Sequence, residues 1–130
     1  MTKRFDGPVR VEVLTRADCP SRGMALAVVE RAVEDTGVPA EVEVVEVGSL
    51  EEARERLLPG SPTVRVDGRD VDPHPNGSEF GLEDRVYRTD RGLSGWPDAQ
   101  WVREALLRAV AGTTANGAHG SSARSSATNP

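Results

Sequence analysis

A lone cysteine is the residue of this chain best suited to nucleophilic chemistry. Cys19 stands in the stretch "TRADCPSRG" (15–23), at the end of an alternating apolar run and directly before Pro20. A second thiol three residues on would make a redox pair, but that position holds Arg22 and the chain has no other cysteine. Cys19 therefore cannot form an internal disulfide. It can attack an external disulfide or a peroxide, and an external thiol must then resolve the product.

The residues that follow Cys19 predict a helix over about 20–36. Pro20 suits its first position, because the missing N–H would be unpaired there anyway. Unpaired N–H groups and the positive end of the helix dipole favour a thiolate at Cys19. Arg22 could add to this effect or bind the carboxylate of a small thiol, whereas Asp18 opposes it.

Other residue types exclude several classes of function. His74 and His119 do not form a metal-site pattern with one cysteine, so no metal is expected. The net charge is −5 and no basic stripe occurs, which argues against binding to nucleic acid. The apolar runs are too short to span a membrane. A lone cysteine and the lack of a secretory signal predict a cytoplasmic protein.

Periodicity predicts the elements that must position Cys19. Alternation predicts strands, the Asp67-Gly68 pair predicts a hairpin, and Ser49 with Glu52 forms a capping-box pattern. The expected strands are 9–15, 40–48, 63–66 and 69–71 (or 84–89 as the partner of 63–66), and the expected helices are 20–36, 49–58 and 97–110. The expected core comprises Met24, Val28, Ala32, Leu26, Val29, Val33, Val42, Val44, Val47, Trp101, Ala105, Leu106 and Val110 or Leu107, with Val45 on the other face.

The resulting order, β-α-β-α-β-β-α, predicts an α/β fold. Its first half implies a right-handed parallel crossover, and the hairpin adds an antiparallel pair. We expect a four-stranded mixed sheet with helices on both faces. Residues 1–8 are interpreted as a loose lead-in, 9–111 as the folded domain, and 112–130 as a disordered polar tail.

Two segments carry a resemblance to a known family. The Cys-Pro junction, followed by "GSPTVRVDG" (60–68) ahead of the third strand, resembles the thioredoxin fold, in particular its small glutaredoxin-like bacterial members. "FGLEDRVYRT" (80–89) is similar to a Gly-Leu-x-x-Arg-Val-Tyr segment of actinobacterial members. The resemblance covers about residues 9–110.

The resemblance implies that the Ser61–Pro62 bond is cis and lies beside Cys19, with Thr63 opening the strand. Pro62 has no N–H, and the turned backbone at Ser61 would offer its edge groups to an extended substrate or a protein partner. The resemblance thus places a groove at Pro62.

The chain also departs from the family pattern. Asp84 stands where actinobacterial members often carry a cysteine, and Glu79, Glu83, Asp84 and Asp90 are interpreted as a solvated acidic loop. The first hypothesis is a monothiol thiol-disulfide oxidoreductase with an external low-molecular-weight thiol as co-substrate. Its catalytic residue is Cys19, and its substrate-binding residues are Pro20, Arg22, Ser61, Pro62 and Thr63.

Two alternatives stay open. The first is a thioredoxin-fold module without redox activity that binds a protein partner in the Pro62 groove. The second is a thiol that detoxifies a soft metal or an electrophile.

Overall fold

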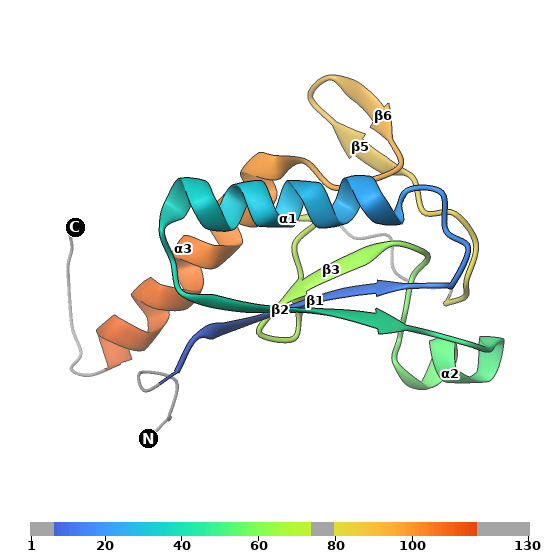
Figure 1. The fold of residues 1–130 in the computed structure, drawn as a ribbon, viewed down its shortest axis with the longest axis horizontal. Helices are drawn as coiled ribbons and strands as arrows, with labels where there is room; N and C mark the ends of the chain where they lie inside the picture. The colour runs from blue at the N-terminus through green and yellow to red at the C-terminus, as the bar shows by residue number, and fades with distance from the viewer. Residues whose placement is uncertain (1–6, 74–79, 117–130) are drawn as a thin grey trace.

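A computed structural model of the protein describes residues 7–73 and 80–116 (Figure 1). The elements run in the order β1 (Val9–Thr15), α1 (Arg22–Thr36), β2 (Ala40–Glu46), α2 (Leu50–Glu55), β3 (Thr63–Val66), β4 (Arg69–Asp70), β5 (Tyr87–Thr89), β6 (Gly92–Ser94) and α3 (Ala99–Asn116). Within these described ranges, no helix is both long and apolar enough to cross a membrane.

Four strands form a mixed sheet in the order β2-β1-β3-β4. Strand β1 is central: it pairs in parallel with β2 along its whole length and antiparallel with β3, where Leu14 faces Thr63. The β3–β4 hairpin turns at Asp67 and Gly68, both with positive φ (51° and 85°), as expected for a two-residue hairpin loop. The predicted four-stranded mixed sheet is therefore confirmed, and its fourth strand is β4.

The two faces of the sheet are covered differently. Alternate residues of β1 point to opposite faces, so one face receives its valines and packs against α1 and α3. The other face is charged along much of β1 and apolar only near Leu14, where α2 covers it (Figure 1). The main cluster contains Val9, Val11, Val13, Ala25, Val29, Ala32, Val38, Val64, Val66, Val71, Val102, Ala105 and Leu106; the smaller one contains Leu14, Val47, Ala53 and Leu58.

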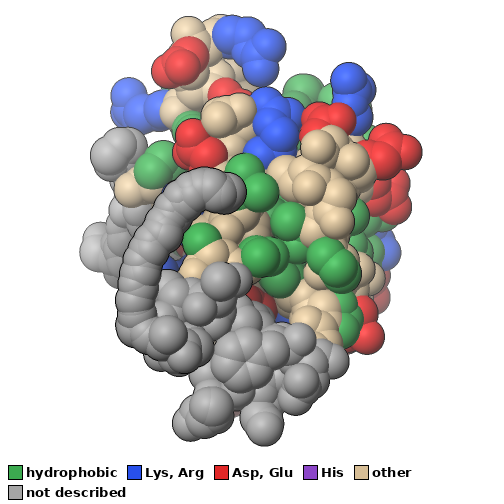
Figure 2. Space-filling model, turned by 90° about the vertical axis from the view of Figure 1, so that its left-hand side faces the viewer, with side chains coloured by type: hydrophobic (Ala, Val, Ile, Leu, Met, Phe, Trp, Pro, Cys, Tyr) green, Lys and Arg blue, Asp and Glu red, His purple; other side chains and the backbone are tan. Residues whose placement is uncertain are grey.

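Several predicted core residues are exposed instead. Met24 is 46% exposed and Val42 is 36% exposed, because α1 buries the stripe of Ala25, Val29 and Ala32 and because β2 is an edge strand. In α3, Leu107 and Val110 are also exposed. Figure 2 shows hydrophobic side chains gathered at the surface on the end of the molecule that holds the last turn of α1.

A second, two-stranded sheet was not predicted. Strands β5 and β6 form a hairpin that projects past the first turn of α1 (Figure 1). Its turn is closed by Thr89, whose hydroxyl donates to the Gly92 carbonyl at 2.8 Å, and Gly92 takes a positive φ of 111°. The expectation that 84–89 might pair with β3 is wrong, because β4 already occupies that edge.

Two helices end at places the sequence did not predict. Helix α2 stops at Glu55, since Leu57 adopts a left-handed backbone with φ of 55°. Helix α3 runs to Asn116, so residues 112–116 are helical rather than part of a disordered tail. Once a helix has started, each further residue adds one hydrogen bond, which lets small polar residues extend it. The expected lead-in at 1–6 and the tail at 117–130 lie outside the described residues.

Candidate functional site

Cys19 lies in the loop between β1 and α1, beyond the last residue of the central strand. It is buried, with 7% of its surface exposed. Its N–H donates to the Arg16 carbonyl at 3.3 Å, and its carbonyl accepts the N–H of Arg22 at 3.2 Å. These two bonds fold the loop into consecutive turns around the thiol.

Helix α1 begins later than predicted. Ser21 is its N-cap and Arg22 its first residue, so Pro20 precedes the helix and Cys19 stands two residues before the cap. The Ser21 side chain accepts no capping hydrogen bond. Instead it lies against Gly95, where an added Cβ would come within 2.5 Å of Ser21 Oγ. The prediction that the helix begins at Pro20, directly after Cys19, is therefore wrong.

The Ser61–Pro62 peptide bond is cis, as the resemblance implies. It stands just before β3, next to the strand end from which the Cys19 loop departs. The two segments are joined directly, because the Arg16 N–H donates to Ser61 Oγ at 3.0 Å. Pro62 is buried, and its carbonyl accepts the hydroxyl of Tyr87.

The backbone of Ser61 is already paired within the chain. Its N–H donates to the Glu83 carbonyl and its carbonyl accepts the Arg85 N–H, both at 2.9 Å, in a parallel bridge centred on Asp84. The edge groups of Ser61 are therefore not open to a substrate or partner, although the resemblance implies that they are. We call the segment that pairs with them, Glu83–Arg85, the inner strap.

Gly60 lets the inner strap come this close. Its φ is 151°, and a Cβ built there would lie 3.0 Å from the Cβ of Arg85 and 3.1 Å from the Glu83 carbonyl oxygen. These contacts are tighter than most Cβ atoms make, and L side chains rarely adopt this φ, so the close approach favours glycine.

Arg85 anchors the inner strap in the interior. Its side chain is 6% exposed and forms ion pairs with Asp70 at 2.9 Å and Asp72 at 3.3 Å. It also donates to Thr63 Oγ1 at 3.1 Å, and Thr63 in turn donates to the Gly60 carbonyl at 2.8 Å. Thr63 thus serves as a structural partner of Arg85 in this structure.

Tyr87 completes the same network. The Arg85 guanidinium lies over its ring, 4.4 Å from the centroid, in a cation–π contact. Burial raises the pKa of the Tyr87 phenol well above its usual range, although the positive charge of Arg85 opposes the shift. The neutral hydroxyl therefore stays available to hold the Pro62 carbonyl.

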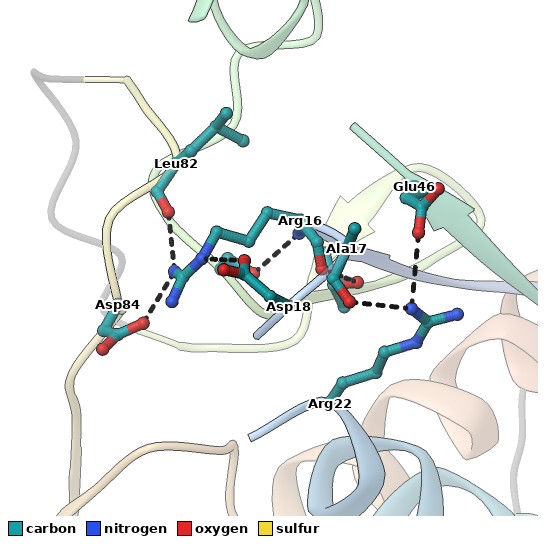
Figure 3. A network of polar contacts seen from close by, with 9 residues as sticks. Arg16, Ala17, Asp18, Arg22, Glu46, Leu82 and Asp84 are labelled. Atoms are coloured by element: carbon teal, nitrogen blue, oxygen red, sulfur yellow. Dashed lines mark hydrogen bonds and ion pairs between the residues drawn. The ribbon is translucent and has the colours of Figure 1, made fainter. Parts of the chain in front are cut away.

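Arg16 ties the Cys19 loop to the inner strap from the outside (Figure 3). Its guanidinium contacts Asp84 at 2.7 Å, Asp18 at 2.9 Å and the Leu82 carbonyl at 2.9 Å. The hydrogen bonds to Asp84 and then to Asp18 raise the pKa of Arg16. Asp84 is exposed, as expected for the acidic loop, but it also pairs with Arg16 beside an open hollow lined by Arg16, Leu82, Glu83 and Asp84.

The side chain of Arg22 points to β2 in Figure 3, where it forms an ion pair with Glu46 at 3.5 Å. It also donates to the carbonyl of Ala17, in the loop after β1, at 3.4 Å. These contacts occupy the guanidinium with a carboxylate of the chain itself. Within the described residues, the Arg22 guanidinium forms no hydrogen bond with Cys19, and its acidic partner at the end of β2 was not predicted.

The structure brings Cys19, Ser61 and Pro62 to one edge of the sheet, together with Arg16, Arg85 and Tyr87, which the sequence did not indicate as site residues. Among the residues that the structure describes, no three metal-binding side chains come together. His74 and His119 lie outside those residues. Comparisons with protein-family models, with curated proteins and with solved structures found no match to this chain.

Proposed function

We propose that this protein is a thioredoxin-like thiol-disulfide oxidoreductase in which Cys19 acts as the only thiol. One observation carries the proposal: the loop that holds Cys19 is hydrogen-bonded to the cis Ser61–Pro62 turn through Arg16. A nucleophile after the central strand and a cis-proline turn beside it are the two features on which the resemblance to the family depends.

The strand order also supports the proposal. A central β1 with a parallel neighbour on one side and an antiparallel hairpin on the other is similar to a thioredoxin-like sheet. In α/β sheets of this kind, the loops at the carboxyl ends of parallel strands form the site. Cys19 lies in such a loop, four residues after Thr15, the last residue of β1.

The reaction proceeds in two exchanges. The Cys19 thiolate attacks one sulfur of an external disulfide, a new S–S bond forms to Cys19, and the other sulfur leaves as a thiolate that takes a proton from water. A low-molecular-weight thiol then attacks the mixed disulfide and frees Cys19. Each cycle consumes one external thiol: one half of the substrate disulfide leaves as a thiol and the other half leaves as a mixed disulfide with the external thiol, so atoms and electrons balance.

Mixed-disulfide formation tests the proposal. We expect the intact mass of the full chain to increase by one 2-hydroxyethylthio group on treatment with bis(2-hydroxyethyl) disulfide, and to return to its original value with added 2-mercaptoethanol. Catalysed exchange should disappear in Cys19→Ser. If folded wild type reacts no faster than the same chain unfolded in urea, the fold does not activate Cys19 and the proposal is wrong.

Burial of Cys19 favours a second candidate, a module of the same fold without redox activity. At 7% exposure the thiol has little surface for attack, and Arg22 is directed to Glu46. This candidate predicts that Cys19→Ser keeps the full biological activity of the protein.

A further inference from the structure

We infer that the substrate of Cys19 is a small, non-peptide disulfide, and that the inner strap excludes substrates that dock through their own main chain. This inference rests on the proposed function and specifies its substrate class. It starts from the backbone of Ser61, which is the edge an extended peptide would have to pair with beside Cys19.

Both hydrogen-bonding groups of that edge are in use. The Ser61 N–H is the donor of a 2.9 Å bond to the Glu83 carbonyl, and the Ser61 carbonyl accepts from the Arg85 N–H at 2.9 Å. An amide N–H supplies one donor, so a peptide could pair there only by displacing the inner strap. Recognition by strand addition requires free edge groups, and Ser61 offers none for it.

The inner strap is held too firmly for easy displacement. Arg85 is bound in the interior by Asp70 and Asp72, and its displacement would break both ion pairs in a place that water reaches poorly. Asp84 is fixed on the outside by Arg16. The inner strap is therefore anchored at both Arg85 and Asp84.

Access to the thiol leads to the same substrate class. Only 7% of Cys19 is exposed, and the loop turns at Arg16 and Arg22 close around it. Attack on a disulfide needs an approach to one sulfur, which a small substituent permits and a polypeptide flanking the sulfur obstructs. The accessible partner is thus a disulfide whose substituents carry no peptide backbone on the attacked sulfur.

Two matched probes test the inference on the full chain. The first is bis(2-hydroxyethyl) disulfide. The second is the symmetrical disulfide of a short acetylated and amidated peptide with a single cysteine, so that a peptide main chain flanks whichever sulfur is attacked. Each second-order rate is divided by that of N-acetylcysteine with the same probe. Because the inner strap occupies the edge at Ser61 and the peptide main chain flanks the attacked sulfur, we expect the normalised rate of the peptide to be lower by about ten-fold or more.

Variants that loosen the inner strap provide the second part of the test. Gly60→Ala forces a Cβ against Arg85 and Glu83, and Asp84→Ala removes the milder external anchor. We expect either change to reduce the difference between the normalised rates of the two probes. Glu83→Ala is the matched control, because it alters the same segment but keeps the hydrogen bond from the Ser61 N–H to the carbonyl of residue 83. It should leave the difference between the two normalised rates unchanged.

The outcomes separate the two proposals. Equal normalised rates for both probes in wild type would overturn the inference while leaving thiol exchange by Cys19 intact. A difference between the two rates that stays the same in a folded Asp84→Ala and a folded Gly60→Ala would also overturn it, because the inner strap would then not be its cause. Reaction with neither probe would refute the proposed function, and the inference with it.

Discussion

The guanidinium of Arg85 lies 2.9 Å from the carboxylate of Asp70, and both side chains are largely buried beneath the cis Ser61–Pro62 turn. A second carboxylate, Asp72, stands on the same guanidinium. The ion pair joins the inner strap, which contains Arg85, to β4, which contains Asp70. The inner strap in turn pairs with Ser61, the first residue of the cis turn. Charged groups, rather than apolar packing alone, therefore fix the geometry beside Cys19.

Removal of Arg85 should destabilise the protein strongly. Arg85→Met removes the guanidinium that pairs with Asp70 and Asp72 in a poorly solvated place, and breaking a buried pair in this way costs about 3–5 kcal/mol. Urea denaturation measures the change in the free energy of unfolding. Arg88→Met is the control, since Arg88 is exposed and forms no ion pair among the described residues; it should change stability by less than about 0.5 kcal/mol. Equal effects of the two substitutions would contradict the network.

Tyr87 offers a direct optical test, because it is the only tyrosine of the chain. Burial raises the pKa of its phenol. In the folded protein, tyrosinate absorbance should therefore be missing at a pH near 10, where a free tyrosine is half ionised. In urea the same phenol should titrate normally.

The same shift predicts a change of stability with pH. The folded protein holds the phenol proton more tightly than the unfolded chain does. The contribution of Tyr87 to stability is thus complete below the ordinary pKa of tyrosine and is lost as the pH rises toward the folded-state pKa. Tyr87→Phe should flatten this alkaline loss, while costing about 1–3 kcal/mol at neutral pH because the Pro62 carbonyl loses its donor. A wild-type alkaline profile in Tyr87→Phe would rule this explanation out.

Glu52 should stabilise the protein only while it is charged. Its carboxylate accepts the Gly48 N–H at 3.0 Å and pairs with Arg56 at 3.0 Å. Both contacts lower the pKa of Glu52, and the hydrogen bond from Gly48 has the larger effect. A lowered folded-state pKa means that the contribution is present above the ordinary pKa of glutamate and is lost as the pH falls through the folded-state value. Glu52→Gln should lower the urea midpoint at neutral pH, with the difference from wild type shrinking in acid.

Glu51→Gln is the control for this experiment, because Glu51 lies in the same helical turn without those hydrogen bonds. If the two variants follow the same pH profile, the effect comes from the helix dipole and not from the Gly48 contact.

Local signals in the sequence predicted the central elements well. The alternation of β1, the Asp67-Gly68 turn and the Ser49–Glu52 cap each depend on residues close in the chain, and each is confirmed. Trp101 packs against the main core as expected for α3. From these features alone, Cys19 is predicted to lie just after a strand and before a helix.

The rest depends on contacts between distant segments. Arginine is rarely buried, so nothing in its immediate neighbours indicates that Arg85 enters the core. The pairing of Ser61 with the inner strap joins residues more than twenty positions apart, and it arises only when Gly60 allows the approach. Likewise Val42 is exposed because β2 is an edge strand, which its own alternation cannot reveal.

Two glycines should respond oppositely to alanine. At Gly60 the φ of 151° is strained for an L residue and a Cβ would crowd Arg85 and Glu83, so Gly60→Ala should cost about 1–3 kcal/mol. Gly23 lies in the first turn of α1 with nothing within 4 Å of an added Cβ. Gly23→Ala should therefore stabilise the protein by up to about 1 kcal/mol, because alanine loses less backbone entropy in a helix. Urea midpoints of both variants measure the contrast. A neutral Gly60→Ala would show that the inner strap yields easily, and a destabilising Gly23→Ala would show that this turn of α1 needs glycine for another reason.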